Sequence, residues 1–149
     1  MEMLVVVAII ALISAVVLPS VATGIDSVRL RTASDSIAGF LNAAVNRAER
    51  LQEAIVVVIS RRDNCLTLYS SQAGFTRELR MPSGVTIEAV LPPLGGGSED
   101  EDGRRLVLLP GAAVPAIGIR IVNQHGSRRL IHLDPMTGFP HVESVGVEE

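Results

Sequence analysis

Residues 1–19, MEMLVVVAIIALISAVVLP, are the stretch on which the fold depends. From Met3 to Leu18 no side chain is charged, and eleven of these sixteen residues are Leu, Ile or Val. At about −0.3 to −0.6 kcal/mol per such residue, the run favours a bilayer by roughly 5 kcal/mol. Continued to Thr23 it reaches about 20 residues, the length that a helix needs to cross the hydrocarbon core. We therefore expect residues 1–23 to form a membrane-spanning helix.

Two simpler interpretations of this segment remain open. It could be a cleaved secretory signal peptide, for which Ser20, Val21 and Ala22 offer a small-x-small cleavage site. However, the apolar run is longer than the roughly 7–15 apolar residues of a signal peptide, and Glu2 stands where a signal peptide carries a positive charge. It could also be a generic signal anchor, which is never cleaved.

Glu2 and Pro19 are the informative interruptions of the apolar run. A carboxylate beside an apolar segment is costly unless it stays at the interface or finds a partner, and proline tends to kink a helix. A glutamate followed by an apolar stretch, with a proline seventeen residues later, resembles the mature N-terminus of type IV pilins and type II secretion pseudopilins. That family has a basic leader ending in Gly and a mature start Phe-Thr-Leu-Ile-Glu. The leader and three mature residues are missing here, so we expect an internal Met start or a trimmed sequence.

The resemblance implies a place and a set of partners. It implies an inner-membrane protein with a single span and its globular part in the periplasm, processed by prepilin peptidase and methylated at the mature N-terminus. Its partners would be membrane lipid and other pilin-like subunits, through the N-terminal helix, with Glu2 and Pro19 as assembly residues. In the family, the glutamate neutralises the N-terminal amine of an adjacent subunit.

Beyond Pro19 the apolar pattern changes from continuous to periodic, which predicts an amphipathic helix with one buried stripe. The sequence offers no strong stop signal between the two parts, so we expect one helix from about Met3 to Gln52, with residues 24–53 continuing into the globular domain. The predicted stripe consists of Ile25, Val28, Ala33, Ile37, Leu41, Ala44, Ala48, Leu51 and Ile55.

Residues 54–149 carry the signals of short strands and turns. The first two strands, 54–60 and 65–70, are expected to form a hairpin, as are 117–123 and 128–134. Val85, Ile87, Ala89 and Leu91 alternate as the buried face of another strand. The remaining expected strands are 75–81, RLVLLP from Arg105, and 139–145.

These features predict an α+β fold in which one long helix packs on antiparallel sheet, without βαβ alternation. The layout of helix, hairpin and closing strands resembles the minor pseudopilins of the H class, grouped with FimT-like minor pilins. That resemblance implies a subunit of a type II secretion pseudopilus that supports protein export. The alternative is a FimT-like minor type IV pilin in pilus assembly or DNA uptake.

We find no catalytic motif, and we expect no enzyme, no cofactor and no metal. Cys65 is the only cysteine, which excludes an internal disulfide, and it is expected to be buried or on an edge strand. A metal site is also considered at His132, Asp134 and His141, which lie on two neighbouring expected strands. The sequence offers no flanking ligands there, so a metal is not expected. The acidic run 98–102 lacks the spacing of a calcium loop, so we expect a solvated loop there.

Pairs of arginines along the sequence raise the question of whether the protein binds nucleic acid. All thirteen basic residues are Arg, and Arg128 with Arg129 follows Gly126 and Ser127, near the Gly-Arg-x-Arg stretch through which some FimT-like pilins bind DNA. Arginine clusters suit phosphate contacts. Aromatic residues for base stacking are scarce, with one Tyr, three Phe and no Trp. Surface solvation is therefore the expected role of these arginines, with DNA contact as the alternative.

Overall fold

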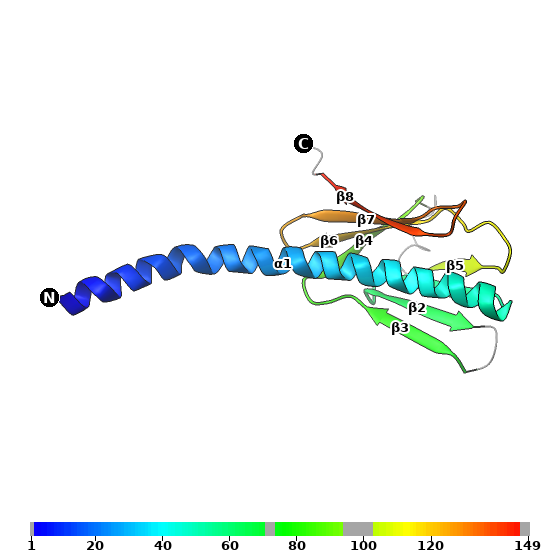
Figure 1. Ribbon diagram of the computed structural model, residues 1–149, viewed down its shortest axis with the longest axis horizontal. Helices are drawn as coiled ribbons and strands as arrows, with labels where there is room; N and C mark the ends of the chain where they lie inside the picture. Colours follow the sequence, from blue (N-terminus) through cyan, green and yellow to red (C-terminus); the bar gives the residue numbers. More distant parts are fainter. Residues whose placement is uncertain (1, 71–73, 94–102, 147–149) are drawn as a thin grey trace.

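The computed structural model describes residues 2–70, 74–93 and 103–146, with side chains described throughout these ranges except at 18–23. In these ranges one long helix precedes eight strands, which confirms the predicted α+β class (Figure 1). The elements are α1 Glu2–Leu51, β1 Ile55–Ser60, β2 Cys65–Ser70, β3 Thr76–Arg80, β4 Val85–Leu91, β5 Arg104–Leu108, β6 Gly118–Asn123, β7 Arg128–Leu133 and β8 Pro140–Val145.

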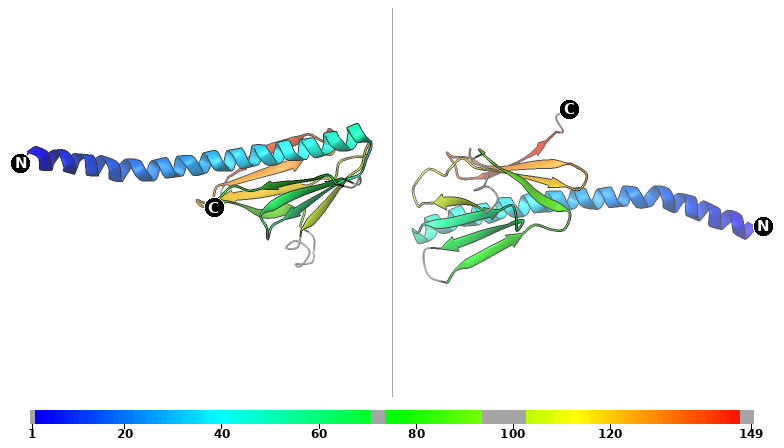
Figure 2. Two further views of the ribbon diagram at one scale, coloured as in Figure 1. Left: turned by 90° about the horizontal axis from the view of Figure 1, so that it is seen from below. Right: turned by 180° about the vertical axis from the view of Figure 1, so that it is seen from behind.

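The strands form two antiparallel sheets of four strands each. The first sheet has the order β3-β2-β1-β5 and the second has the order β4-β6-β7-β8. Both predicted hairpins are present, with Ile55 opposite Ser70 in one and Gly118 opposite His132 in the other. The chain enters the second sheet at β4, returns to the first at β5 and goes back at β6 (Figures 1 and 2).

The helix α1 continues from the free N-terminal segment into the globular part, and its C-terminal half lies along both sheets (Figure 2). It runs without interruption through Pro19, where a kink was conceivable. It ends in a Schellman-type cap, because the N–H of Glu53 donates to the carbonyl of Ala48 at 3.2 Å and Gln52 takes φ 54°. Among the described side chains, no helical stretch combines the length and the apolar character needed to cross a membrane.

The buried stripe of α1 is shorter than its periodicity predicts. Ile25, Val28 and Leu51 are 47%, 64% and 45% exposed, so their predicted burial is wrong. Ile25 and Val28 precede the part of the helix that the core covers, whereas Leu51 lies in its last turn. The stripe that the structure buries consists of Leu30, Ala33, Ser34, Ile37, Phe40, Leu41, Ala44 and Ala48.

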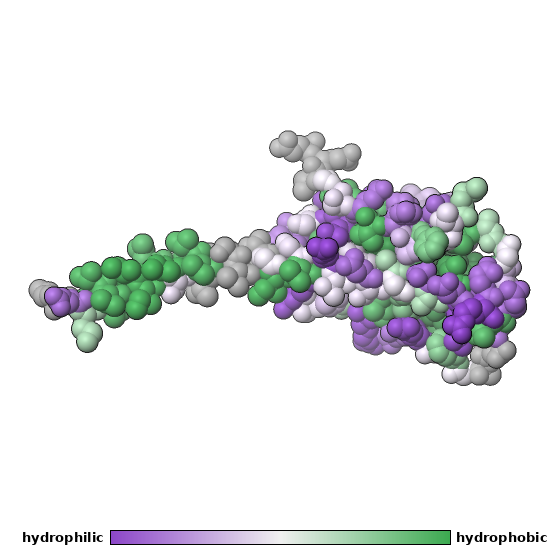
Figure 3. Space-filling view, viewed as in Figure 1, coloured by the Kyte–Doolittle hydropathy of each residue, from purple (hydrophilic) through white to green (hydrophobic). Residues whose placement is uncertain are grey.

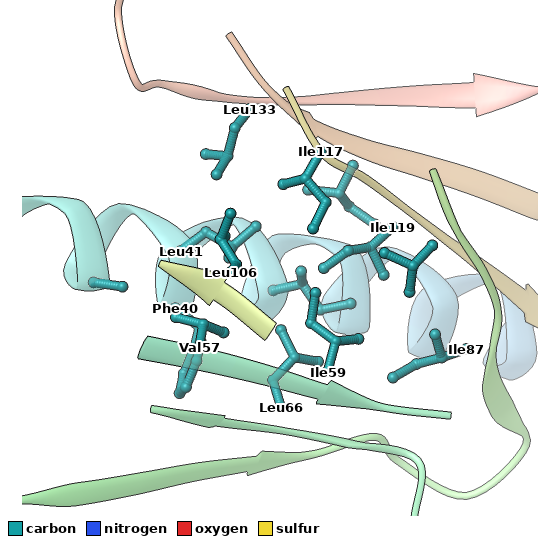
Figure 4. Packing of buried hydrophobic residues seen from close by; sticks show 14 of the residues in the cluster. Phe40, Leu41, Val57, Ile59, Leu66, Ile87, Leu106, Ile117, Ile119 and Leu133 are labelled. Atoms are coloured by element: carbon teal, nitrogen blue, oxygen red, sulfur yellow. The ribbon is translucent and has the colours of Figure 1, made fainter. Parts of the chain in front are cut away.

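One core joins the helix to both sheets. Figure 4 shows Leu41 of α1, Ile59 of β1 and Ile119 of β6 among the side chains that gather in the same space. All three are fully buried. Burying a Leu or Ile side chain contributes about 1.5–3 kcal/mol, so this shared cluster holds the two sheets together without a disulfide.

Strand β4 departs from its predicted alternation. The pairing with β6 shifts between Ile87 and Ala89, a β-bulge that leaves Glu88 as the extra residue. Beyond the bulge the buried position moves to Val90, so the predicted inward face with Ala89 and Leu91 is wrong. A bulge inserts one residue and reverses the two-residue period that follows.

Candidate assembly surface

The first part of α1 is an apolar surface that no part of the described globular domain covers. Every described residue from Glu2 to Val17 is exposed, on all sides of the helix. Met3 is 83% exposed and Leu12 is 73% exposed. Figure 3 shows this segment projecting from the domain, with a largely hydrophobic surface behind a hydrophilic tip. A contiguous apolar surface of this kind marks a site for protein or membrane contact.

Glu2 lies at the tip of this surface. Its side chain is exposed, and no other described residue forms an ion pair with it. It is the only charged residue of the sequence between Met1 and Gly24. The structure therefore places the predicted assembly carboxylate at the far end of the helix from the domain. Pro19 lies on the same helix, but its side chain is outside the described residues.

A polar cluster holds the helix where it enters the domain. The carboxylate of Asp26 lies 3.1 Å from Nδ1 of His125 and 3.5 Å from Nη1 of Arg29. His125 belongs to the β6–β7 turn, which Asn123 closes by accepting the backbone N–H groups of His125 and Ser127. Sequence reasoning missed this cluster, because its acid and its histidine lie almost a hundred residues apart.

The two arginines considered for DNA contact have partners within the fold. Nε of Arg128 lies 3.0 Å from both carboxylate oxygens of Glu88, the residue that the bulge adds to β4. Nη1 of Arg129 donates to Oγ of Ser34 on α1 at 3.4 Å. Both side chains are half-buried, so neither offers a fully free guanidinium.

The histidines and acids considered for a metal site are brought only partly together. His132 and His141 face each other across β7 and β8, with ring centroids 5.5 Å apart. Asp134 lies beyond the end of β7, so its predicted place within the strand is wrong. Its carboxylate accepts the N–H of Met136 at 2.8 Å, and hydrogen bonds from Met136 and Thr137 lower its pKa. Among the described residues no three potential metal ligands form a group.

Cys65 and the acidic run complete the predicted sites. Cys65 is buried at the start of β2, and burial raises the pKa of its thiol above the ordinary value. A raised pKa keeps the thiol protonated, which disfavours a nucleophilic role. The acidic run 98–102, where calcium was considered, lies outside the described residues.

A single extended helix, free in its first part and packed on antiparallel sheets in its second, is the architecture of a pilin-like fold. The solved structure of the minor pseudopilin EpsH from the type 2 secretion system of Vibrio cholerae has this fold. It superposes with a TM-score of 0.60 at 12% sequence identity and covers 78% of this chain and 97% of that chain. The similarity therefore establishes the fold. No protein-family model and no curated protein matches the sequence.

Proposed function

We propose that this protein is a minor pilin-like subunit of a type II secretion pseudopilus, which supports protein export. The observation that carries the proposal is the free apolar part of α1 on a fold shared with a minor pseudopilin. Such a segment needs lipid or other apolar helices around it, because the hydrophobic effect disfavours this much exposed apolar side chain in water.

In the proposed mechanism, the apolar segment of α1 moves from the lipid bilayer into a bundle of helices. The segment first lies in the inner membrane as a single span, with the globular domain in the periplasm, and it is processed there by prepilin peptidase and methylated. On assembly the same apolar side chains pack against the helices of neighbouring pilin-like subunits. Since burial of an unpaired carboxylate costs several kcal/mol, Glu2 favours the register in which it meets a cation of the neighbour.

Replacement of Glu2 tests this mechanism. Glu2→Ala should leave membrane insertion intact, because it removes a charge from an apolar segment, and it should abolish incorporation into the filament. Asp35→Ala is the matched control, since Asp35 is an exposed acid on the domain half of α1. Insertion is measured by membrane fractionation and incorporation by the amount of protein in sheared pseudopili. Equal incorporation of the Glu2 variant and the control contradicts the assigned role.

The alternative is a FimT-like minor type IV pilin in pilus assembly or DNA uptake, which uses the same helix. Its DNA contact rests on Arg128 and Arg129, and the ion pair of Arg128 with Glu88 weakens that case. The two proposals differ in their genomic setting, because one needs the genes of a secretion system and the other those of a pilus.

A further inference from the structure

A second candidate site lies at the opposite end of α1 from the apolar segment. It is a pocket of about 280 Å³ between the last turns of the helix and strands β2 and β3. Arg47 and Arg50 of the helix and Arg77 of β3 line it, and none of the described residues of its lining is acidic. Figure 3 shows strongly hydrophilic side chains gathered over this end of the domain.

The arginines of the pocket have no acidic partner among the described residues. The described ion pairs involve Asp26, Glu78 and Glu88, and none of them includes one of these three arginines. Of the acids nearest in sequence, Glu49 accepts the N–H of Gly111 and Oε2 of Glu53 accepts the hydroxyl of Ser70, while Oε1 of Glu53 is buried without a hydrogen-bond partner. Three arginines without an acidic partner in the described part of the chain thus share one concave surface.

Aromatic contacts hold two of these cations in place. The guanidinium carbon of Arg47 lies 3.6 Å from the centre of the Phe75 ring, and that of Arg77 lies 5.9 Å from the centre of the Phe40 ring. Cation–π contacts of this kind orient a guanidinium without neutralising it. Nε of Arg47 is buried and has no hydrogen-bond partner. The same holds for Oε1 of Glu53 and Nε of Arg120, so the lack of a partner at this atom is not specific to the pocket.

A purely structural role explains only part of this arrangement. A cation in the last turn of a helix interacts favourably with the negative end of the helix dipole, which accounts for Arg50. It does not account for Arg77, which belongs to a strand more than twenty residues later. The convergence of two elements on one pocket favours a binding role.

We propose that this pocket binds an acidic peptide segment of a partner protein in which a carboxylate side chain lies beside an apolar one. Guanidinium groups pair with carboxylates through two parallel hydrogen bonds. The apolar wall is supplied by Leu68, which is buried, and by Leu51 and Phe75, which are partly exposed. The proposal concerns a surface remote from the apolar segment and does not rest on the proposed function.

The size and chemistry of the pocket favour a peptide over nucleic acid. Its volume is near the lower end of ligand pockets, about 300 Å³, whereas single-stranded nucleic acid is bound along grooves of about four nucleotides or more. Single-strand binding also needs aromatic faces for base stacking. Phe75 is the one aromatic residue in the described lining of the pocket, and Arg47 covers one of its faces.

Peptide binding by the full chain in detergent micelles tests this proposal. The probe is a fluorescent, capped hexapeptide of alternating Glu and Leu, and its comparison is the matching peptide of Gln and Leu. We expect the acidic peptide to bind at least about tenfold more tightly, because charged hydrogen bonds are the stronger ones. Anisotropy of the labelled peptide gives both affinities.

Charge reversal locates the binding. Arg50→Glu with Arg77→Glu should weaken binding of the acidic peptide by about tenfold or more. Arg61→Glu with Arg62→Glu is the matched control, since both residues are exposed in the β1–β2 turn and the change in net charge is the same. The control should bind as the unchanged protein does.

A neutral pair of substitutions covers the case in which charge reversal unfolds the domain. Arg50→Gln with Arg77→Gln keeps polar side chains at both positions, and its thermal melting curve shows whether the fold is intact. A folded neutral variant with unchanged affinity overturns the proposal, as does equal loss in the pocket and control variants. Tighter binding of a thymidine dodecamer, lost in the same pocket variants, overturns it in favour of nucleic acid.

Discussion

Asn64 connects the two sheets through a single side chain. It ends the β1–β2 turn with φ 53°, a left-handed conformation that Asn tolerates better than most residues. Its Nδ2 donates to the carbonyl of Val85 at 2.8 Å, and its Oδ1 accepts the N–H of Ile87 at 2.9 Å. The turn of the first sheet is thereby fixed to the first residues of β4 in the second.

We expect Asn64→Ala to lower the free energy of unfolding by about 2–3 kcal/mol. The substitution removes two hydrogen bonds, and alanine lacks the polar side chain that helps asparagine adopt the left-handed conformation. Asn64→Gly, which keeps the conformation available, should cost less than the alanine change. Denaturant unfolding in detergent measures both. Asn46→Ala on the exposed face of α1 is the control, and an equally small effect at both positions contradicts the assigned role.

Asp134 makes the stability depend on pH. Hydrogen bonds from Met136 and Thr137 to the carboxylate hold its pKa below the ordinary value of 3.8. Because the folded pKa is depressed, the stabilisation is present above that value and is lost as the pH falls through the folded pKa. Asp134→Asn should therefore flatten the fall of the melting temperature between about pH 5 and about pH 2. Asp35→Asn is the comparison, and an identical profile for both variants contradicts the prediction.

The helix α1 has two halves with different energetic roles. Leu41→Ala creates a cavity in the core and should cost about 2–5 kcal/mol, whereas Val28→Ala at an exposed position should change the stability by less than about 0.5 kcal/mol. Leu41 is fully buried and Val28 is 64% exposed. Unfolding by urea in the same detergent compares the two, and similar costs would mean that Val28 is covered in solution.

The elements were the part of the fold most accessible from sequence. The helix and both hairpins were predicted because a 3.6-residue period, β-branched runs and polar turns are local signals. The limits of the buried stripe were not, since Ile25 and Val28 keep the period although the core begins only at Leu30. The 3.6-residue period indicates which face of the helix is apolar. How far along the helix that face is buried depends on where the sheets end.

Partners across the sheets required the structure. The bulge at Glu88 has no local signal, and Arg128, forty residues later, supplies the charge that pairs with it. Likewise β5 lies beside β1 although three strands separate them in the chain order. Such contacts depend on how the two sheets pack, which the alternation of a single strand does not determine.

At the scale of the whole molecule, the two candidate surfaces differ in how they could be found. The apolar segment is contiguous in sequence, so its need for apolar surroundings was predicted from composition, whereas the assembly role of Glu2 was implied by the resemblance to pilins. The basic pocket combines Arg47 and Arg50 of α1 with Arg77 of β3, and only the fold brings them together. The arginines considered for DNA contact, Arg128 and Arg129, instead contact Glu88 and Ser34 within the fold.

The separation of the surfaces leads to a prediction about the whole chain. Removal of residues 1–24 deletes no core residue, since the buried stripe begins at Leu30. The shortened protein should therefore stay folded, with its unfolding free energy changed by less than about 0.5 kcal/mol, and should no longer self-associate without detergent. Urea unfolding and sedimentation measure these properties. A loss above about 2 kcal/mol would mean that the segment packs on the domain.

The position of Cys65 makes the chain well suited to chemical labelling. It is the only native thiol, it is 7% exposed, and its raised pKa leaves little reactive thiolate at neutral pH. A cysteine placed at Val16 or at Arg50 would react with maleimide far ahead of it. Spectroscopic probes could thus report on either end of α1 in the otherwise unaltered protein.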